Sequence, residues 1–235
     1  MPLPARDLHR FAEKYARARA VALEQLPRRG TSGLELEWNL LDGRMRPLQT
    51  VGSGPDRRSF VDVLRGERLP GWLAEQSQLE VFHWMVEFAT RPYYLECGAV
   101  YESRLLEAGL LNALADTGRV FGGQLYAGHG NLFAAVAVDP ACIPGGWNLA
   151  KRRYLERCVE LYGDRLATAG IHANISLPEP LLEWEFMHLP PAERGDAHLD
   201  AYRSRVYVEA ARLLRAFAAL FIATSASTPL RVEAR

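Results

Sequence analysis

The chain has 235 residues, and its 28 lysines and arginines are balanced by 28 aspartates and glutamates. This zero net charge argues against a nucleic-acid partner and against an acidic disordered tail. Hydrophobic residues make up 49% of the chain and charged residues 24%, as in ordinary soluble globular proteins. A chain of this length can bury a sizeable core without disulfides.

Targeting features of the sequence favour a soluble, cytoplasmic protein. Met1–Gly30 carries seven basic and three acidic residues and no unbroken apolar stretch, so it does not resemble a secretory signal. The eight-residue apolar run Ala216–Ala223 is far shorter than the roughly 20 residues that cross a bilayer. Cys97, Cys142 and Cys158 have no C-x-x-C spacing, which favours a reducing compartment.

The first half of the chain predicts a leading helix followed by strands. Apolar residues at three- and four-residue spacing predict a helix from Pro4 to about Pro27. Residues Gly33–Leu41 alternate apolar and polar side chains, which predicts a half-buried strand, and Asp42-Gly43 predicts a hairpin turn. A short helical pattern then runs through Leu64. The aromatic and β-branched segment Leu79–Thr90 predicts a strand that ends before a proline.

The second half adds three helices and another alternating strand. A helix is expected at Ala99–Thr117, closed by Gly118, and two short apolar runs follow at Val120–Tyr126 and Leu132–Val138. A second helix is expected at Leu149–Tyr162, ending before Gly163. A strand at Ile171–Leu177 and an alanine-rich helix at Leu199–Thr224 complete the chain. No repeat or linker stands out. We therefore expect one α+β domain over residues 1–235, with a mostly antiparallel or mixed sheet and residues 1–30 as a leading helix.

Carboxylates on the predicted strands are the first candidates for a functional site. Glu35 and Glu37 lie two residues apart, so one strand face places them about 6.6 to 6.8 Å apart, where they can hold Mg²⁺. The alternative is that they form the solvated face of an edge strand. Glu87 lies in an apolar strand, where a carboxylate is costly to bury unless it is paired or metal-bound. Glu80, seven residues earlier, would face the opposite side in a regular strand, so either a bulge or turn intervenes or only one of the two acids points at a site.

A second polar row is predicted on the strand at Ile171–Leu177. His172, Asn174 and Ser176 share one face, where they either line a pocket or are simply solvated. Other motifs are weak: the glycines around residues 122–130 match neither a dinucleotide-binding loop nor a Walker A loop and are best interpreted as a turn. Because only two of the 28 basic residues are lysines, phosphate chemistry would depend on arginine, metal ions or backbone amides.

Three segments in order resemble the signature segments of the glutamate–cysteine ligases. They are Gly33–Glu37 (GLELE), Met85–Pro92 (MVEFATRP) with Glu80 seven residues before its glutamate, and Ala169–Pro178 (AGIHANISLP). The family patterns are G-[IV]-E-x-E, hydrophobic-E-[FIL]-x-T-x-P and G-[IV]-H-x-N-[FI]-S-L-P. The resemblance extends from about Gly33 to Pro229 and does not cover the first thirty residues closely.

The resemblance implies a glutamine synthetase-like fold, in which an antiparallel sheet with helices on its outer face forms a funnel lined by metal-binding acids. It further implies that ATP and Mg²⁺ convert the γ-carboxylate of glutamate into an acyl phosphate, which the amine of cysteine or another amine attacks. The implied metal-binding residues are Glu35, Glu37, Glu80, Glu87 and His172. Glu35 and Glu87 are also implied catalytic residues, and His172, Asn174 and Ser176 are implied to bind substrate or nucleotide.

The sequence departs from the family at its end. Family members continue beyond the Ser-x-Ser-x-Pro region at Ser225–Pro229, and the continuation supplies a further metal-binding acid and phosphate-binding arginines. We therefore expect either a fragment or truncated paralogue, or a partner chain that completes the funnel. An exposed sheet edge would also favour a homo-oligomer. The alternative function is a catalytically inactive ligand-binding or interaction protein derived from the same fold. The expected partners are small molecules, with no nucleic acid and no membrane.

Overall fold

A computed structural model describes residues 30–51, 58–132, 135–194 and 198–219. The helix expected at Pro4 to Pro27 lies outside these residues. The chain divides into two compact units. The sheet unit is described between Ser32 and Asn174, and the helical unit comprises residues 30–31 and the chain from Ile175 onwards. None of the described helices is both long and apolar enough to cross a membrane.

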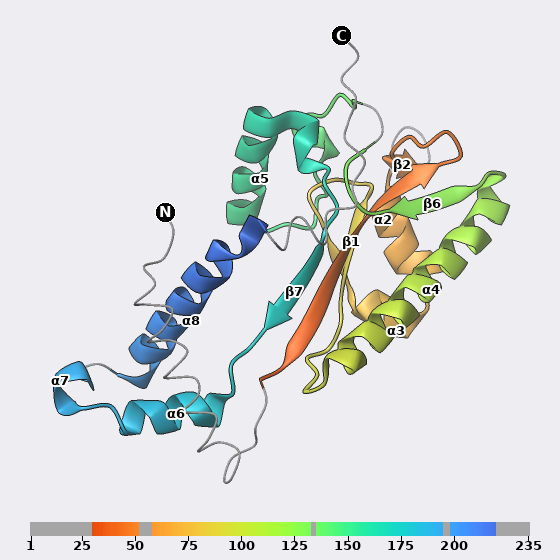
Figure 1. The fold of residues 1–235 in the computed structure, drawn as a ribbon. Coiled ribbons are helices and arrows are strands. Elements are labelled where there is room, and N and C mark those ends of the chain that lie inside the picture. The colour runs from red at the N-terminus through yellow and green to blue at the C-terminus, as the bar shows by residue number, and fades with distance from the viewer. Residues whose placement is uncertain (1–29, 52–57, 133–134, 195–197, 220–235) are drawn as a thin grey trace. The chain divides into compact units, whose positions relative to one another are not determined.

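The sheet unit is built around β1 (Ser32–Asp42), the central strand of a five-stranded sheet (Figure 1). β5 (Met85–Ala89) pairs antiparallel with one edge of β1, and β4 (Ser77–Leu79) pairs antiparallel with β5. β6 (Leu125–Gly128) pairs antiparallel with the other edge of β1, and β7 (Ile171–Ile175) also pairs with β1. The expectation of an α+β fold with a mostly antiparallel sheet is confirmed.

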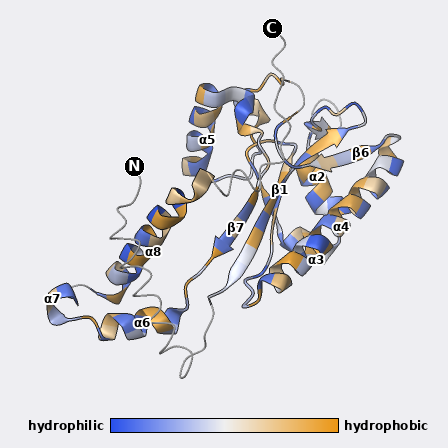
Figure 2. Ribbon diagram, in the orientation of Figure 1, coloured by the Kyte–Doolittle hydropathy of each residue, from blue (hydrophilic) through white to orange (hydrophobic). Residues whose placement is uncertain are grey.

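One face of this sheet is packed against helices. The elements on this side include α2 (Phe60–Val63), the π-helical turn η2 (Leu64–Arg68), α3 (Gly71–Glu75) and α4 (Glu96–Phe121), with the short strands β2 (Thr50–Val51) and β3 (Arg58–Ser59) beside them. Hydrophobic and hydrophilic residues alternate around α4 (Figure 2). Its apolar side chains meet the apolar face of β1 in one buried cluster, which contains Leu36, Trp38, Leu40, Leu106, Leu110 and Leu114.

The opposite face of the sheet is covered at one end by a second apolar cluster. Leu41 of β1 and Met85 of β5 pack there with α5 (Leu149–Tyr162), which contributes Leu155 and Val159. The 3₁₀ turns η3 (Pro140–Cys142) and η4 (Gly163–Leu166) flank this helix. The remaining length of this face carries polar side chains of β1, because strand residues alternate between the two faces.

The helical unit contains α6 (Glu179–Met187), α7 (Pro191–Arg194) and α8 (Leu199–Ala216). α6 packs on α8 through Phe186 and the buried Tyr202, whose ring centroids lie 5.6 Å apart. Arg203 of α8 forms ion pairs with Glu179 and, at 3.5 Å, with Glu183 of α6. Apolar packing and paired charges thus hold the two helices together.

Several predicted elements have the right type but different bounds. The strand expected at Leu79–Thr90 is two strands, because residues 80–84 form a turn between β4 and β5. The run Val120–Tyr126 is shared between the end of α4 and the start of β6. The strand at Ile171–Leu177 ends at Ile175, and α8 ends at Ala216. By contrast, α5 has the predicted bounds, and its N-cap Asn148 accepts the Lys151 N–H at 2.9 Å.

Gly118 was expected to close a helix, and this was wrong. α4 runs through Gly118 and ends at Gly122, which takes the left-handed conformation (φ 73°) that favours glycine. A Cβ on Gly118 would lie 2.3 Å from the carbonyl oxygen of Gly123. Gly118 is therefore needed for the close return of the chain towards β6, and not as a helix end.

Candidate functional site

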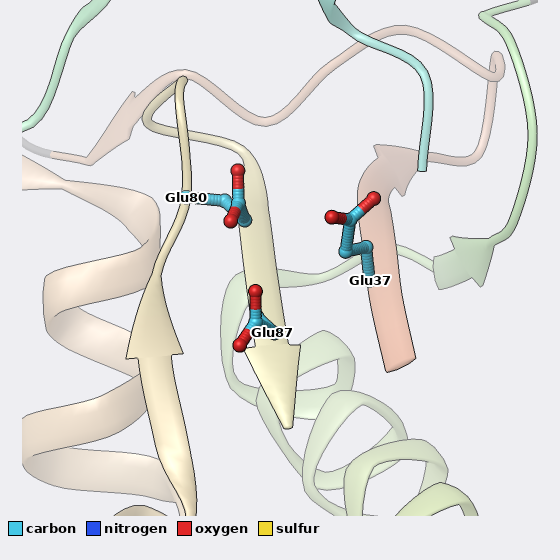
Figure 3. Close-up of side chains that lie close together, drawn as sticks. All are labelled: Glu37, Glu80 and Glu87. Atoms are coloured by element: carbon cyan, nitrogen blue, oxygen red, sulfur yellow. The ribbon is translucent and has the colours of Figure 1, made fainter. Parts of the chain in front are cut away.

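Three carboxylates from two strands and a turn meet on the polar part of the sheet. One oxygen atom each from Glu37, Glu80 and Glu87 lies within 4.8 Å of the others (Figure 3). Glu37 on β1 is directly opposite Glu87 on β5 in the strand register. We call these three residues the carboxylate cluster. Like charges at directly opposed strand positions repel each other, so this arrangement is not one that stability alone would favour.

Glu80 reaches the cluster because the chain turns between β4 and β5. A regular strand would place Glu80 and Glu87 on opposite faces, and the turn at residues 80–84 removes that constraint. The backbone N–H of Val81 donates to Glu80 Oε2 at 3.1 Å. Phe82 and Trp84 in the same turn are fully buried and stack with ring centroids 4.7 Å apart. The alternative of an intervening turn is therefore the correct one.

Glu35 and His172 extend the site along β1. His172 Nδ1 lies 3.3 Å from Glu35 Oε2, and His172 Nε2 lies 3.7 Å from Glu37 Oε1. The imidazole therefore lies between the two glutamates of β1, on the neighbouring strand β7. Glu37 is the better shielded of the two, with 11% of its side chain exposed against 35% for Glu35. The structure thus brings Glu35, Glu37, Glu80, Glu87 and His172 into one region.

Backbone contacts hold Glu37 in place. The N–H of Gly170 donates to Glu37 Oε2 at 2.7 Å, and the N–H of Glu37 donates to the Gly170 carbonyl at 2.9 Å. His129 Nδ1 lies 2.6 Å from the Glu37 carbonyl oxygen, and its ring centroid lies 3.6 Å from that of Trp38. One oxygen of the Glu37 carboxylate is therefore used by the protein itself.

Two acids of the cluster, Glu37 and Glu87, have pKa values above the ordinary value for glutamate. Burial raises the pKa of Glu87 from its ordinary 4.5 to about 8, and the hydrogen bond with Glu80 and the charges of Glu80, Glu35 and Glu37 add to this effect. Burial also raises the pKa of Glu37, although the Gly170 N–H opposes the rise. For Glu37 the charge of His172 also opposes the rise, whereas the neighbouring acids add to it.

A divalent cation would supply the missing charge. Among the described residues, no arginine or lysine forms an ion pair with Glu35 or with any member of the carboxylate cluster. Carboxylate oxygens are the ligands that Mg²⁺ and Ca²⁺ prefer, and converging acids with raised pKa values release protons when such an ion binds. The donor set therefore fits a divalent cation such as Mg²⁺, which Glu37, Glu80 and Glu87 could hold with Glu35 and His172 beside them.

Asn174 and Ser176 are placed differently from the acids. Asn174 is exposed on β7, two residues beyond His172 and so on the same strand face. Ser176 belongs to the helical unit, where its Oγ accepts the Thr31 N–H at 2.9 Å and lies 2.8 Å from the Thr31 hydroxyl. Binding of substrate or nucleotide by these two residues stays a prediction.

Sequence reasoning missed three residues that surround the acids, namely Asn39, His129 and Gly170. His129 belongs to the glycine-rich segment that was interpreted as a turn. Gly170 belongs to the segment that resembles a family signature, but only its backbone contacts Glu37. Asn39 had a usable signal, since it follows Glu35 and Glu37 at the same two-residue spacing on β1.

Comparisons with known proteins bear on the fold. No protein-family model matches the chain. No curated protein matches it either. Among solved structures, the chain is similar to a bifunctional glutathione synthetase from Pasteurella multocida, with 15% identity and a TM-score of 0.51. The match covers 80% of this chain and 21% of that one, so the chain spans about a fifth of the length of its structural neighbour. What the two share is the fold of this segment.

Proposed function

We propose that the chain is part of an ATP- and magnesium-dependent carboxylate–amine ligase of the glutamate–cysteine ligase type. The observation that carries the proposal is the convergence of Glu37, Glu80 and Glu87, with Glu35 and His172 beside them. These five residues come from three separate segments that resemble family signatures. The similarity in fold to part of a bifunctional glutathione synthetase supports the same class of chemistry.

In the proposed reaction, an oxygen of the glutamate γ-carboxylate attacks the γ-phosphorus of ATP and ADP leaves. The amine of cysteine, or of another amino compound, then attacks the acyl carbon of the γ-glutamyl phosphate. An amide bond forms, inorganic phosphate leaves, and the amine loses a proton. A bound magnesium ion would neutralise the phosphate oxygens during phosphoryl transfer.

The chain's own residues have distinct parts in this proposal. Glu37, Glu80 and Glu87 hold the magnesium ion, and Gly170 fixes the Glu37 carboxylate through its N–H at 2.7 Å. Glu35 and His172 form a hydrogen-bonded pair at 3.3 Å on the border of the cluster, where they can orient the substrate carboxylate. The proposal includes a sheet that forms a funnel as in glutamine synthetase-like enzymes, and a cytoplasmic location.

Phosphate release tests the reaction. With Mg²⁺, ATP, glutamate and cysteine present, the chain, together with any further chain that completes it, should release phosphate only when both amino acids are present. Glu87→Gln should abolish this release, because it removes the negative charge of a carboxylate proposed to bind the metal while preserving the side-chain volume. Glu75→Gln is the matched control, since Glu75 is exposed at the end of α3. A chain that fails to bind Mg²⁺-ATP under all these conditions would contradict the ligase proposal.

A second candidate is a protein that binds metal and glutamate or nucleotide without turning them over. The lack of a lysine or arginine paired with the carboxylate cluster among the described residues favours it, because binding of a metal ion alone would balance the charge of these acids. Calorimetry would then detect binding of glutamate or nucleotide, and phosphate release would stay at background. Measurable ligase turnover by the chain excludes this candidate.

A further inference from the structure

Asn39 is a buried polar residue at the border between the carboxylate cluster and the second apolar cluster. It follows Glu35 and Glu37 on the same face of β1 and is paired with Met85 on β5 and Gly128 on β6. Only 2% of its surface is exposed. A buried amide normally has partners for its polar atoms, so the contacts of Asn39 show what it holds.

The Asn39 amide binds two separate segments of the chain. Its Nδ2 donates to the carbonyl oxygens of Gly130 and Ala167, each at 3.0 Å. Because both partners are acceptors, the amide nitrogen must point towards them, and this settles the orientation of the group. Its Oδ1 is buried without a hydrogen-bond partner among the described residues. An unpaired buried acceptor costs stability, so packing alone does not explain an asparagine here.

The two segments that Asn39 holds are also joined to each other. The Gly130 N–H donates to the Ala169 carbonyl at 2.5 Å, and the Ala169 N–H donates to the Gly130 carbonyl at 3.0 Å. Three residues beyond Ala167, the N–H of Gly170 meets the Glu37 carboxylate. The chain then enters β7, where His172 lies between Glu35 and Glu37. The Asn39 side chain thus connects β1 to the segment that supplies both the Gly170 N–H and His172.

We propose that Asn39 is a positioning residue for the carboxylate cluster. By holding residues 128–131 and 167–170 against β1, it aims the Gly170 N–H at Glu37 and places His172 beside Glu35. Asparagine suits this task because its NH₂ group offers two donors, whereas ionised aspartate and leucine offer none to the Gly130 and Ala167 carbonyls. The proposal deepens the proposed function, since it rests on the cluster as a metal site.

Metal affinity separates positioning from simple stabilisation. Asn39→Ala should weaken Mn²⁺ binding, followed by electron paramagnetic resonance, at least about tenfold, in the range seen when residues that orient metal ligands are lost. Thr117→Ala is the matched control, because Thr117 is also fully buried and its hydroxyl donates to the Ala113 carbonyl at 2.6 Å within α4. Thr117→Ala should lower the melting temperature and leave Mn²⁺ affinity within twofold of wild type. Equal affinity for Asn39→Ala and wild type would overturn the proposal.

The Gly170 amide gives a readout that does not require metal. In metal-free protein, the amide proton chemical shift of Gly170 should move in Asn39→Ala, because its bond to Glu37 lengthens, and should stay unchanged in Thr117→Ala. If wild type fails to bind Mn²⁺, the proposed function is contradicted, while this shift still tests the role of Asn39. An unmoved Gly170 resonance in a folded Asn39→Ala protein would contradict positioning.

Gly170→Ala tests the other end of the same connection, and also serves if Asn39→Ala does not fold. A Cβ at Gly170 would lie 3.1 Å from His172 Nε2 and 3.5 Å from Glu37 Oε2, so it should displace the imidazole while leaving Asn39 intact. It should weaken Mn²⁺ binding to a similar extent. In the double variant the loss should be smaller than the sum of the two single losses. Fully additive losses, or an unchanged affinity in Gly170→Ala, would contradict the proposed connection.

Discussion

The two faces of β1 differ in what they contribute. On one face, Leu36, Trp38 and Leu40 are almost fully buried against the helices, and this burial is a large favourable term in folding. On the other face, Glu35 and Glu37 lie beside further acids, with no arginine or lysine paired to them among the described residues. Burial on the apolar face therefore stabilises the fold, whereas repulsion between the acids on the other face destabilises it.

Removing a buried side chain from the apolar face should have the largest effect on stability. Leu110→Ala should lower the free energy of unfolding by about 2 to 5 kcal/mol, because Leu110 is fully buried in the cluster between α4 and the sheet. Leu111→Ala is the matched control, since the neighbouring Leu111 is 46% exposed. Urea denaturation measures both. Similar losses for the two variants would contradict the assignment of the apolar face.

Metal binding should restore stability on the acidic face. At a Mg²⁺ concentration 100 times its dissociation constant, the free energy of unfolding should rise by about 2.7 kcal/mol. Glu87→Gln should remove this increase, and Glu75→Gln should retain it. Thermal unfolding with and without Mg²⁺ makes the comparison. An increase that persists in Glu87→Gln would place the metal elsewhere.

Glu102 on α4, an acid outside the candidate site, is expected to stabilise the fold. Burial works against its ionisation, but the Arg91 N–H at 2.7 Å, Gln76 at 3.0 Å and the Arg91 side chain at 2.9 Å together lower the pKa of Glu102 below 4.5. Because the folded state favours the charged form, its contribution is present above pH 4.5 and is lost as pH falls through the lowered pKa.

Glu102→Gln should therefore cost about 2 kcal/mol at pH 7 and less in acid. Urea denaturation at pH 7 and pH 3 measures the difference between wild type and variant. Arg104→Gln, which breaks an exposed pair with Glu107 on the same helix, is the control and should have little effect. A cost that does not shrink in acid would show that Glu102 acts through packing and not through charge.

Without metal, Glu87→Gln should stabilise the protein slightly, by roughly 1 kcal/mol or less. The pKa of Glu87 is raised to about 8, so the metal-free wild type should lose stability as pH rises from about 5 through 8. The glutamine variant has no such charge and should show a weaker pH dependence. With saturating Mg²⁺ the order of stability should reverse. The same order under both conditions would contradict the metal-site interpretation.

The secondary structure was predictable where a local pattern decided it. The strict alternation of GLELEWNLL indicated β1, and Asn148 and Gly163 marked both ends of α5. Prediction failed where tertiary packing decided the outcome. The residues around Phe82 and Trp84 look like strand because they are apolar and aromatic, yet they form a turn whose rings fill the second apolar cluster.

The candidate site was only partly predictable for the same reason. The spacing of Glu35 and Glu37 indicated a shared strand face, but the meeting of Glu37 with Glu80 and Glu87 was expected only from the resemblance to a family. The local sequence does not show that Glu80 lies beside Glu87, since this depends on the turn at residues 80–84, which precedes β5. The contact between Gly170 and Glu37 could not be predicted either, because every residue except proline has a backbone N–H.

The turn between β4 and β5 contains two buried aromatic residues and one acid of the candidate site. Phe82 and Trp84 fix it from inside the protein, and Glu80 at its start belongs to the carboxylate cluster. A survey of random substitutions would therefore find changes at these two aromatic positions among those that impair metal binding, although neither ring offers an oxygen ligand. The residues on which the proposed metal site depends therefore include buried aromatic side chains as well as the carboxylates that would bind the metal.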